Sequence, residues 1–279
     1  MRTYLITGGT DGMGRGLGLL FLARGDRVIA VASGEAKGKA FLEAAERIGA
    51  GDRAQFWRAD LSTVAGMKSV ASRAVERLDR LDGLVFAAQR FRPEREVTED
   101  GVEYTFAVTY LNRHVLAHDL AGLLERAEAP VIFSLSGSGG LPGKIFWDDP
   151  TFARGRYTGM RAAMQASRSV DLDAADFARR HPDSKIRYVL YNPMFVKTAM
   201  ADPLKQPMKG VTKVMEVLFA QRVEQAVPPM ARLMDDPPRE ALSAFRRGKP
   251  LPVDGEDFDP ERADRLRALT ERLLAEARG

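Results

Sequence analysis

The sequence predicts an α/β fold, a single doubly wound parallel sheet with helices on both faces. Short apolar runs alternate with longer amphipathic stretches along most of the chain, which is typical of parallel β-α units. The first run leads directly into a glycine-rich segment and then into a helix pattern, as expected of a strand, a tight connection and a helix. With 279 residues, no internal repeat and no linker ahead of residues 200–207, the chain is expected to form one domain, residues 1–279.

The expected elements follow in chain order. The first strand starts at about Arg2, and the next strands are the apolar runs 28–31, 54–57, 83–87, 130–135 and 186–190. Two long helices are expected near 102–125 and 155–180. The last part predicts a helix near 212–234 broken at Pro228 and Pro229, an extended piece around Phe245 and a charged helix over 260–277, with breaks at 237–238 and 250–252. We interpret 193–235 as a substrate lid region and 236–279 as completion of the fold.

Composition narrows the class of protein. Hydrophobic residues make up 45% and charged residues 29%, and no apolar stretch approaches the roughly 20 residues that span a bilayer, so no membrane role is expected. The net charge is +4 and the basic residues are scattered, so no nucleic-acid partner is expected. The chain has no cysteine, and its first strand leaves no space for a signal peptide, which indicates a cytoplasmic protein.

A glycine-rich elbow follows the first predicted strand. Residues 7–14 read Thr-Gly-Gly-Thr-Asp-Gly-Met-Gly. One glycine turns the chain, one lets the backbone approach a pyrophosphate and one lets the helix pack close to the strand, while the helix N-terminus offers N–H groups to the anion. An ordinary tight turn is the alternative interpretation. The elbow predicts a nucleotide cofactor held at Gly8, Thr10, Asp11, Gly12, Met13 and Gly14.

In this order of elements, the chain resembles the short-chain dehydrogenase/reductase family, and its retinol-dehydrogenase-like branch in particular. The elbow matches the family's Thr-Gly-x-x-x-Gly-x-Gly, Ala59-Asp60-Leu61-Ser62 matches its third-strand signal, and residues 98–103 and 185–198 are similar to further segments of that branch. The resemblance implies a nicotinamide cofactor, with Asp60 at the adenine ring. It implies further cofactor contacts from Leu61, Ala87, Ala88, Gln89, Pro193, Val196 and Thr198.

The catalytic positions depart from the family, which uses asparagine, serine, tyrosine and lysine. The resemblance implies Tyr157 as the tyrosine, with Arg161 at the lysine position one helical turn further on. Arginine keeps the positive charge, so it is expected to lower the pKa of Tyr157 and hold the ribose, although it cannot shuttle a proton. The serine position falls on Gly137, so that Ser138 is the candidate replacement, and the asparagine position falls on Thr109.

The second strand bears on the choice of cofactor. Members that prefer NAD place an acid at its end, whereas this chain has Ser33, followed by Lys37 and Lys39. A hydroxyl beside a lysine suits a 2′-phosphate, so NADP(H) is expected to be preferred over NAD(H), with Ser33 and Lys37 in contact with it. Ordinary surface charge is the alternative for either lysine.

Two other groups of residues have competing interpretations. His114 and His118 have the i,i+4 spacing of helical zinc pairs beside Asp119, but no third ligand is evident and no metal is expected. The segment 141–156 is expected to border the substrate, and its Asp148 or Asp149 is either an extra acid or, more simply, a capping or turn residue.

These observations predict an oxidoreductase that reduces a carbonyl, imine or activated double bond of a small, fairly apolar molecule. Loss of three family residues leaves a competing hypothesis, in which the fold serves a non-redox step such as dehydration or cyclisation, or a non-catalytic cofactor-binding role. The expected partner is a small-molecule substrate, and the family resemblance implies a homodimer or homotetramer that pairs through the helices near 102–125 and 155–180.

Overall fold

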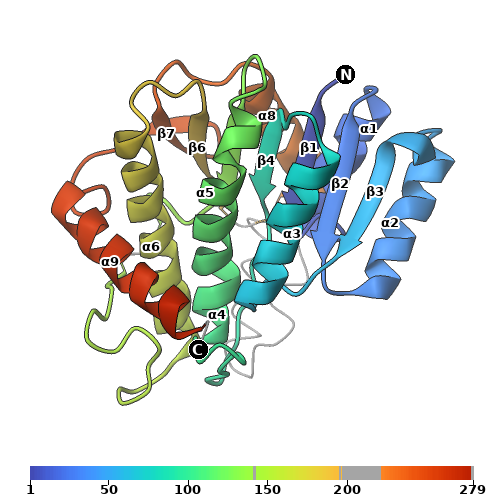
Figure 1. Ribbon diagram of the computed structural model, residues 1–279. Helices are drawn as coiled ribbons and strands as arrows, with labels where there is room; N and C mark the ends of the chain where they lie inside the picture. Colours follow the sequence, from blue (N-terminus) through green and yellow to red (C-terminus); the bar gives the residue numbers. More distant parts are fainter. Residues whose placement is uncertain (141–142, 195, 197–220, 278–279) are drawn as a thin grey trace.

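The computed structural model describes residues 1–140, 143–194, 196 and 221–277, and they form one eight-stranded sheet with helices on both sides (Figure 1). The strands are β1 Thr3–Thr7, β2 Arg27–Ala32, β3 Ala54–Arg58, β4 Gly83–Phe86, β5 Val131–Leu135, β6 Arg187–Asn192, β7 Leu242–Arg246 and β8 Lys249–Leu251. The helices are α1 Gly12–Ala23, α2 Glu35–Arg47, α3 Val64–Arg77, α4 Tyr104–Phe106, α5 Asn112–Leu124, α6 Gly159–Arg180, α8 Val223–Asp235 and α9 Pro260–Glu276. A 3-10 turn covers Gly51–Arg53 and a π-helical turn covers Ala107–Leu111.

The strand order is β3-β2-β1-β4-β5-β6-β7-β8. Neighbouring strands are parallel from β3 to β7, and β8 pairs antiparallel with β7 at the edge. The doubly wound parallel sheet predicted from the sequence is confirmed. The chain runs from β1 outward to β3 and then crosses to β4 on the other side of β1, so the strand order reverses between β1 and β4. Ligands of such sheets bind outside the carboxyl ends of the strands at this reversal.

Helices α3, α5 and α6 cover one face of the sheet, with α9 outside α6, and α1, α2 and α8 cover the other (Figure 1). Strand residues alternate between the two cores because successive side chains point to opposite faces. In β1, Leu5 joins the core under α3 and α5, whereas Tyr4 and Ile6 join the core under α1 and α8. The sheet thus holds the glycine elbow rigidly at its carboxyl edge.

The expected strand around Phe245 is β7, and the charged helix is α9, with Asp259 as its N-cap. The expected break at Pro228 and Pro229 is wrong, because both prolines lie inside α8. An interior proline costs roughly 3 kcal/mol. Helix α8 buries an apolar face against α1, and this packing outweighs the helix propensity. The buried residues of that face are Ala226, Val227, Met230, Ala231 and Met234.

Two more boundaries differ from expectation. The predicted break at 250–252 is partly strand, since Pro250 lies in β8, an edge position that tolerates a missing N–H. The predicted helix near 155–180 begins later, at Gly159, with Thr158 as N-cap. Of the predicted helix near 212–234, residues 212–220 lie outside the described residues.

Candidate functional site

The elbow between β1 and α1 is built so tightly that Gly8, Gly9 and Gly14 have no room for a side chain. Gly8 has a φ of 66°, and a Cβ on it would lie 2.8 Å from the main-chain nitrogen of Ala88. A Cβ on Gly14 would lie 2.5 Å from the carbonyl oxygen of Gly8. The Gly8 N–H donates to the Val31 carbonyl oxygen at 2.8 Å. The elbow is therefore held against the ends of both β2 and β4.

The N-terminus of α1 opens from this elbow. Gly12 has a φ of 50°, and Asp11 caps the helix by accepting a hydrogen bond from the Gly12 N–H at 2.8 Å. Thr10 is buried beside it, and Met13 is half-buried. Lys37 of α2 pairs with the Asp11 carboxylate. The first N–H groups of a helix, together with its dipole, favour an anion, so this edge suits a pyrophosphate.

Residues 87–89 follow β4 beside the elbow. The Ala87 N–H donates to the Thr7 carbonyl oxygen at 3.1 Å, and the Gln89 side chain donates to the Leu135 carbonyl oxygen at 3.2 Å. Ala88 faces Gly8 directly. The structure thus brings these three predicted cofactor residues to the strand-order reversal, next to the elbow.

Arg113 lies beneath this edge and was not singled out by sequence reasoning. It is fully buried on α5 and donates to the Leu135 carbonyl oxygen at 2.8 Å, to Ser134 Oγ at 2.9 Å and to the Ala88 carbonyl oxygen at 3.4 Å. Burial lowers the pKa of Arg113 to about 10, so it stays charged at neutral pH. It fastens the ends of β4 and β5 together. No sequence signal marked it, because Arg113 lies between two other polar residues, Asn112 and His114.

The predicted adenosine end lies at the carboxyl ends of β2 and β3. Ser33 is exposed directly after β2, and the guanidinium of Arg58 donates from Nε to the Ser33 carbonyl oxygen at 3.3 Å. Asp60 is exposed and accepts hydrogen bonds from Ser62 N and Oγ, at 2.9 and 2.8 Å, while Leu61 is buried. Arg58 is thus a second basic residue beside Ser33 that sequence reasoning missed.

The predicted nicotinamide end follows β6. Pro193 is half-buried, and Val196 forms a parallel bridge with Gln221. Asn192 ties this end to β5, because its side chain donates to the Ser138 carbonyl oxygen at 2.9 Å. Thr198 lies outside the described residues.

Tyr157 lies in a different setting from the one the resemblance implied. It precedes the N-cap Thr158, so it is outside α6 and does not share a helical face with Arg161. Its hydroxyl donates to the Arg92 carbonyl oxygen at 2.9 Å and to Glu103 Oε1 at 3.1 Å. The pKa of Tyr157 is raised to about 12, mainly by burial and to a smaller extent by the negative charge of Glu103. The expected lowering of this pKa by Arg161 is therefore wrong.

Arg161 supports the preceding loop. Its Nη1 donates to the Arg156 carbonyl oxygen, and its guanidinium lies over the rings of Phe146, at 4.3 Å from the centroid, and Phe152, at 5.4 Å. The structure does not bring Arg161 to the Tyr157 hydroxyl. The positive charge of Arg161 therefore serves to hold the aromatic rings and main chain of the preceding loop against α6.

Ser138 is only 1% exposed, and its hydroxyl contacts Ser136 Oγ at 2.7 Å and the carboxylate of Asp171. Burial raises the pKa of Asp171 to about 7. Thr109 is buried in the π-helical turn. Neither candidate presents an exposed hydroxyl to a substrate, and Asp171 was not anticipated from the sequence.

The helix position that faces the end of β5 is Ser167. A Cβ on Gly137 would lie 2.4 Å from Ser167 Oγ. Ala163, one helical turn before Ser167, is half-buried, as Ser167 is. The α6 side chain that faces Gly137 is thus a serine, and the position one turn before it is an alanine, which has no proton to donate.

The loop before α6 decides between the alternatives for Asp149. Asp149 accepts hydrogen bonds from the N–H groups of Ala153, Arg154 and Gly155, at 2.7, 3.1 and 2.7 Å. It is therefore a turn residue. Asp148 lies next to Trp147, on the side of the molecule that α9 covers. The guanidinium of Arg265, from α9, lies over the Trp147 ring, 4.6 Å from its centroid.

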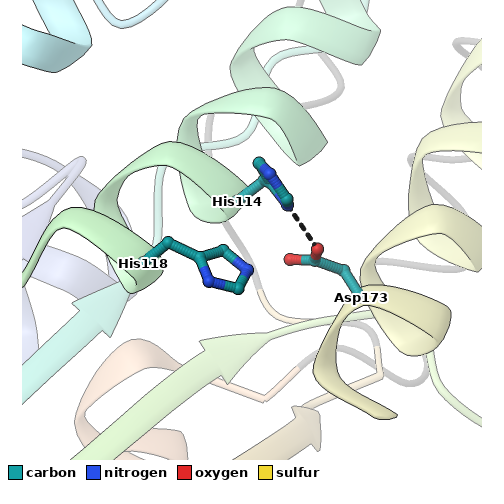
Figure 2. A group of neighbouring side chains, drawn as sticks. All are labelled: His114, His118 and Asp173. Atoms are coloured by element: carbon teal, nitrogen blue, oxygen red, sulfur yellow. Dashed lines mark hydrogen bonds and ion pairs between the residues drawn. The ribbon is translucent and has the colours of Figure 1, made fainter. Parts of the chain in front are cut away.

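The histidine pair has a third neighbour that the sequence did not reveal. Figure 2 shows His114 and His118 on α5 pointing toward Asp173 of α6. His114 Nδ1 lies 2.7 Å from Asp173 Oδ1. Asp173 is the third ligand-type side chain that was not evident from the sequence, because two helices that are distant in sequence meet here.

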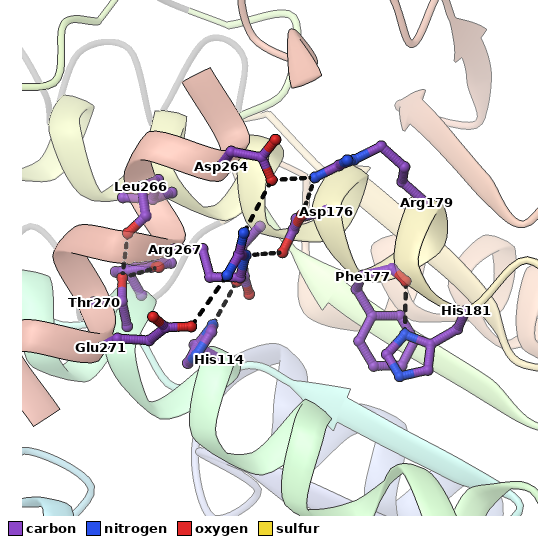
Figure 3. Close-up of polar contacts among 12 residues, drawn as sticks. His114, Asp176, Phe177, Arg179, His181, Asp264, Leu266, Arg267, Thr270 and Glu271 are labelled. Atoms are coloured by element: carbon purple, nitrogen blue, oxygen red, sulfur yellow. Dashed lines mark hydrogen bonds and ion pairs between the residues drawn. The ribbon is translucent and has the colours of Figure 1, made fainter. Parts of the chain in front are cut away.

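Helix α9 covers part of the helix surface expected to pair two copies of the chain. Figure 3 shows α9 lying against α6, where Arg179 pairs with Asp264 and Asp176 with Arg267, at 3.5 Å for the latter pair. The hydroxyl of Thr270 lies 2.6 Å from that of Tyr110 in the π-helical turn. A homodimer or homotetramer stays a prediction. Helix α9 leaves less of the α6 surface exposed for contact with a second copy of the chain. Among the described helices, none has the length and apolar character to cross a bilayer.

Comparison with known proteins identifies the family. The model of the short chain dehydrogenase family matches residues 2–148, more than half of the chain. The chain is 30% identical to the "Putative daunorubicin C-13 ketoreductase DnrU" of Streptomyces sp. (strain C5), over 71% of this chain and 67% of that protein. It is 25% identical to mouse retinol dehydrogenase 13, over 71% of this chain and 60% of that protein.

Solved structures agree on the fold. The NADP complex of a short chain dehydrogenase from Burkholderia cenocepacia J2315 has a TM-score of 0.69 and 19% identity, with 89% of this chain and 97% of that chain covered. Three observations point to the same family: the order of the strands, the glycine elbow at the strand-order reversal, and the relatives found by sequence. The chain therefore belongs to the short-chain dehydrogenase/reductase family of oxidoreductases, with retinol dehydrogenases among its relatives.

Proposed function

We propose that the protein is an NADP(H)-dependent oxidoreductase that reduces a small, fairly apolar molecule. The observation that carries the proposal is the elbow, whose Gly8 and Gly14 leave no space for a Cβ and whose Gly12 opens the N-terminus of α1 to an anion. These residues fit a dinucleotide pyrophosphate. The cofactor, when bound, supplies a hydride, and the protein binds it, orients it and excludes water.

The choice of NADP(H) is supported by charge at the adenosine end. Ser33 carries no acid that would repel a 2′-phosphate, and Arg58 contacts its main chain at 3.3 Å. Lys37, in contrast, is occupied by Asp11. The structural relative from Burkholderia cenocepacia is described as a complex with NADP, which agrees with this preference.

The group that is reduced in the substrate is proposed to be a carbonyl, an imine or an activated double bond. The side chains expected to protonate the product are engaged elsewhere, because Tyr157 donates to Glu103 and Arg92 and Ser138 is bound to Asp171. An imine protonated in solution brings its own proton, so among the three acceptors it needs the least help from the protein. Of the three, we therefore favour the imine.

The experiment is a titration of purified protein with NADPH, followed by a panel of ketones, imines and enones monitored by loss of NADPH absorbance. Gly12→Val is expected to abolish NADPH binding while the circular dichroism spectrum is retained, since a branched side chain fills the phosphate space. Gly122→Ala is the matched control, because a Cβ at Gly122 meets nothing within 4 Å. If Gly12→Val binds NADPH normally, the elbow is not the cofactor site.

A second candidate is a cofactor-binding protein without reductase chemistry, or one that catalyses a non-redox step. It is favoured by the residue types where β5 meets α6, because Gly137 follows β5 and the α6 side chain that faces it is Ser167. Tight NADPH binding with no turnover of any member of the panel would support this candidate and exclude the first.

A further inference from the structure

The three histidines of the chain gather in one place, away from the glycine elbow. His114 and His118 lie on α5, and His181 follows α6, with its ring centroid 6.0 Å from that of His118. Asp173, 5% exposed, projects from α6 toward the first two (Figure 2). Three ligand-type atoms, one each from His114, His118 and Asp173, lie within 4.8 Å of one another.

We propose that His114, His118 and Asp173 form a binding site for a zinc-like transition-metal ion that links α5 to α6. This proposal is independent of the proposed reductase function. Around a tetrahedral zinc the ligand atoms are roughly 3.3–3.6 Å apart, because each is about 2.0–2.2 Å from the metal. The separations here run from 2.7 Å to no more than 4.8 Å, so small side-chain adjustments bring all three atoms into range.

The nitrogen of His118 supplies the second argument. Its Nε2 is buried and has no hydrogen-bond partner among the described residues. A buried polar atom without a partner costs about 1–3 kcal/mol, and a coordinated metal ion would satisfy it.

The chemical types of the three ligands indicate which metals the site suits. Two imidazoles and one carboxylate suit zinc, nickel, copper or iron, whereas magnesium and calcium prefer oxygen ligands. The surroundings are aromatic, since His118 packs against Phe177 with ring centroids 5.4 Å apart, and Tyr110 lies on the other side of His114 at 6.2 Å. His118 is half-buried, which leaves a path for the ion and a position for water as a fourth ligand.

The site would act on the helix layer that also receives α9. Tyr110, one turn before His114, contacts Thr270 of α9, and Asp176, one turn after Asp173, pairs with Arg267 (Figure 3). A metal bridge between α5 and α6 would therefore stiffen the surface on which α9 rests. A structural ion contributes its binding free energy directly to folding.

The test uses untagged full-length protein, treated with a chelator and titrated with Co²⁺ and then Zn²⁺. We expect one equivalent of Co²⁺ to give the visible d–d absorption of a four-coordinate site and Zn²⁺ to displace it, with a Kd on the order of 1 μM or tighter. Zinc is also expected to raise Tm.

Two variants decide whether these residues are the ligands. His118→Phe keeps an aromatic ring against Phe177 but removes the nitrogen, and Asp173→Asn keeps the shape but removes the charge. Each is expected to weaken Co²⁺ binding at least about 100-fold, with NADPH affinity and circular dichroism unchanged. Should one variant fail to fold, the other decides. Asp119→Asn, on the exposed side of α5, is the control and should bind Co²⁺ as the unmodified protein does.

The proposal is overturned if the unmodified protein shows no four-coordinate Co²⁺ spectrum, or if His118→Phe binds the metal as tightly as the unmodified protein. It is also overturned if Asp119→Asn weakens binding as much as His118→Phe, because the metal would then be held by surface carboxylates. In each case the contact of His114 with Asp173 would be a structural hydrogen bond between helices.

Discussion

Arg58, the last residue of β3, donates a hydrogen bond from its Nε to the main-chain carbonyl oxygen of Ser33, directly after β2, with 3.3 Å between the two atoms. This contact places a guanidinium at the edge where the adenosine half of a dinucleotide is expected to lie. The Arg58 guanidinium also forms an ion pair with the Glu35 carboxylate, with 3.6 Å between the two groups. The proposed preference for NADP(H) therefore has a candidate phosphate ligand in addition to Ser33.

Replacing Ser33 with Asp is predicted to reverse the cofactor preference. The new carboxylate would repel a 2′-phosphate and accept hydrogen bonds from the ribose hydroxyls of NAD(H). We expect the affinity for NADPH to fall about tenfold or more, equivalent to about 1.4 kcal/mol, and that for NADH to rise. Fluorescence titration with each cofactor checks this, and equal affinities of the unmodified protein for NADPH and NADH would contradict the premise.

Replacing Arg58 with Ala is predicted to weaken NADPH binding about tenfold and to leave NADH binding unchanged, because a charged hydrogen bond to the phosphate is worth about 1.5–3 kcal/mol. Lys39→Ala is the matched control, since Lys39 is exposed and also pairs with Glu35, at 2.9 Å. A loss of similar size for both cofactors would show that Arg58 supports the fold of this edge and does not bind a phosphate.

The end of β5 offers a gain-of-function test. Gly137 faces Ser167, and Ala163 precedes Ser167 by one turn. Gly137→Ser, Ala163→Tyr and Ser167→Lys together would therefore add a serine facing position 167 and, one turn apart on α6, a tyrosine and a lysine. We expect reduction of simple ketones to appear or to rise at least about tenfold, since a tyrosine acid contributes typically 10²–10⁴-fold when well placed. The same triple variant with Phe at position 163 is the control.

If the triple variant binds NADPH and folds normally yet reduces ketones no faster than its Phe control, Ala163 does not face the reacting atoms. The catalytic arrangement would then have to be sought elsewhere on the cofactor edge.

Tyr157→Phe is predicted to leave NADPH-dependent turnover within about threefold of the unmodified protein, because the Tyr157 hydroxyl is directed at Glu103 and Arg92. The variant should lose about 1 kcal/mol of unfolding free energy from its hydrogen bonds. Glu103 remains satisfied in the variant, since it also accepts from the N–H groups of Thr105 and Phe106. If turnover instead fell by about two orders of magnitude at unchanged NADPH affinity, Tyr157 would be restored as the proton donor.

The sequence predicted the sheet because its strands are continuous apolar runs that differ clearly from their helical neighbours. It also predicted the elbow, since a glycine with a φ of 66° or without space for a Cβ leaves a local signature, as at Gly8 and Gly14. Local patterns are enough for such features.

The catalytic edge was less predictable because it depends on which residue of α6 faces β5. That register is set by the length and path of the loop before α6, which no local pattern encodes, so Tyr157 was assigned to a helix that begins only at Gly159. The contacts of His114 with Asp173 and of Arg58 with Ser33 join segments distant in sequence, and single-sequence reasoning has no access to them.

Asp171 gives a prediction that depends on pH. It is completely buried on α6 beside Ser138 and Arg168, and burial raises its pKa from 3.8 to about 7 despite the nearby guanidinium. The folded state therefore holds this proton more tightly than the unfolded chain does. The stabilisation from the protonated form is complete below about pH 4, is lost as pH rises toward 7 and changes no further above the folded pKa.

Asp171→Asn cannot titrate, so the unfolding free energy of the variant relative to the unmodified protein is predicted to rise between pH 5 and pH 8. The rise should be at least about 1.4 kcal/mol, the free energy that corresponds to one pKa unit. Urea unfolding of both proteins at both pH values measures it. A difference for Asp171→Asn that stays constant from pH 5 to pH 8 would mean that Asp171 is ionised throughout, with Arg168 compensating its burial in full.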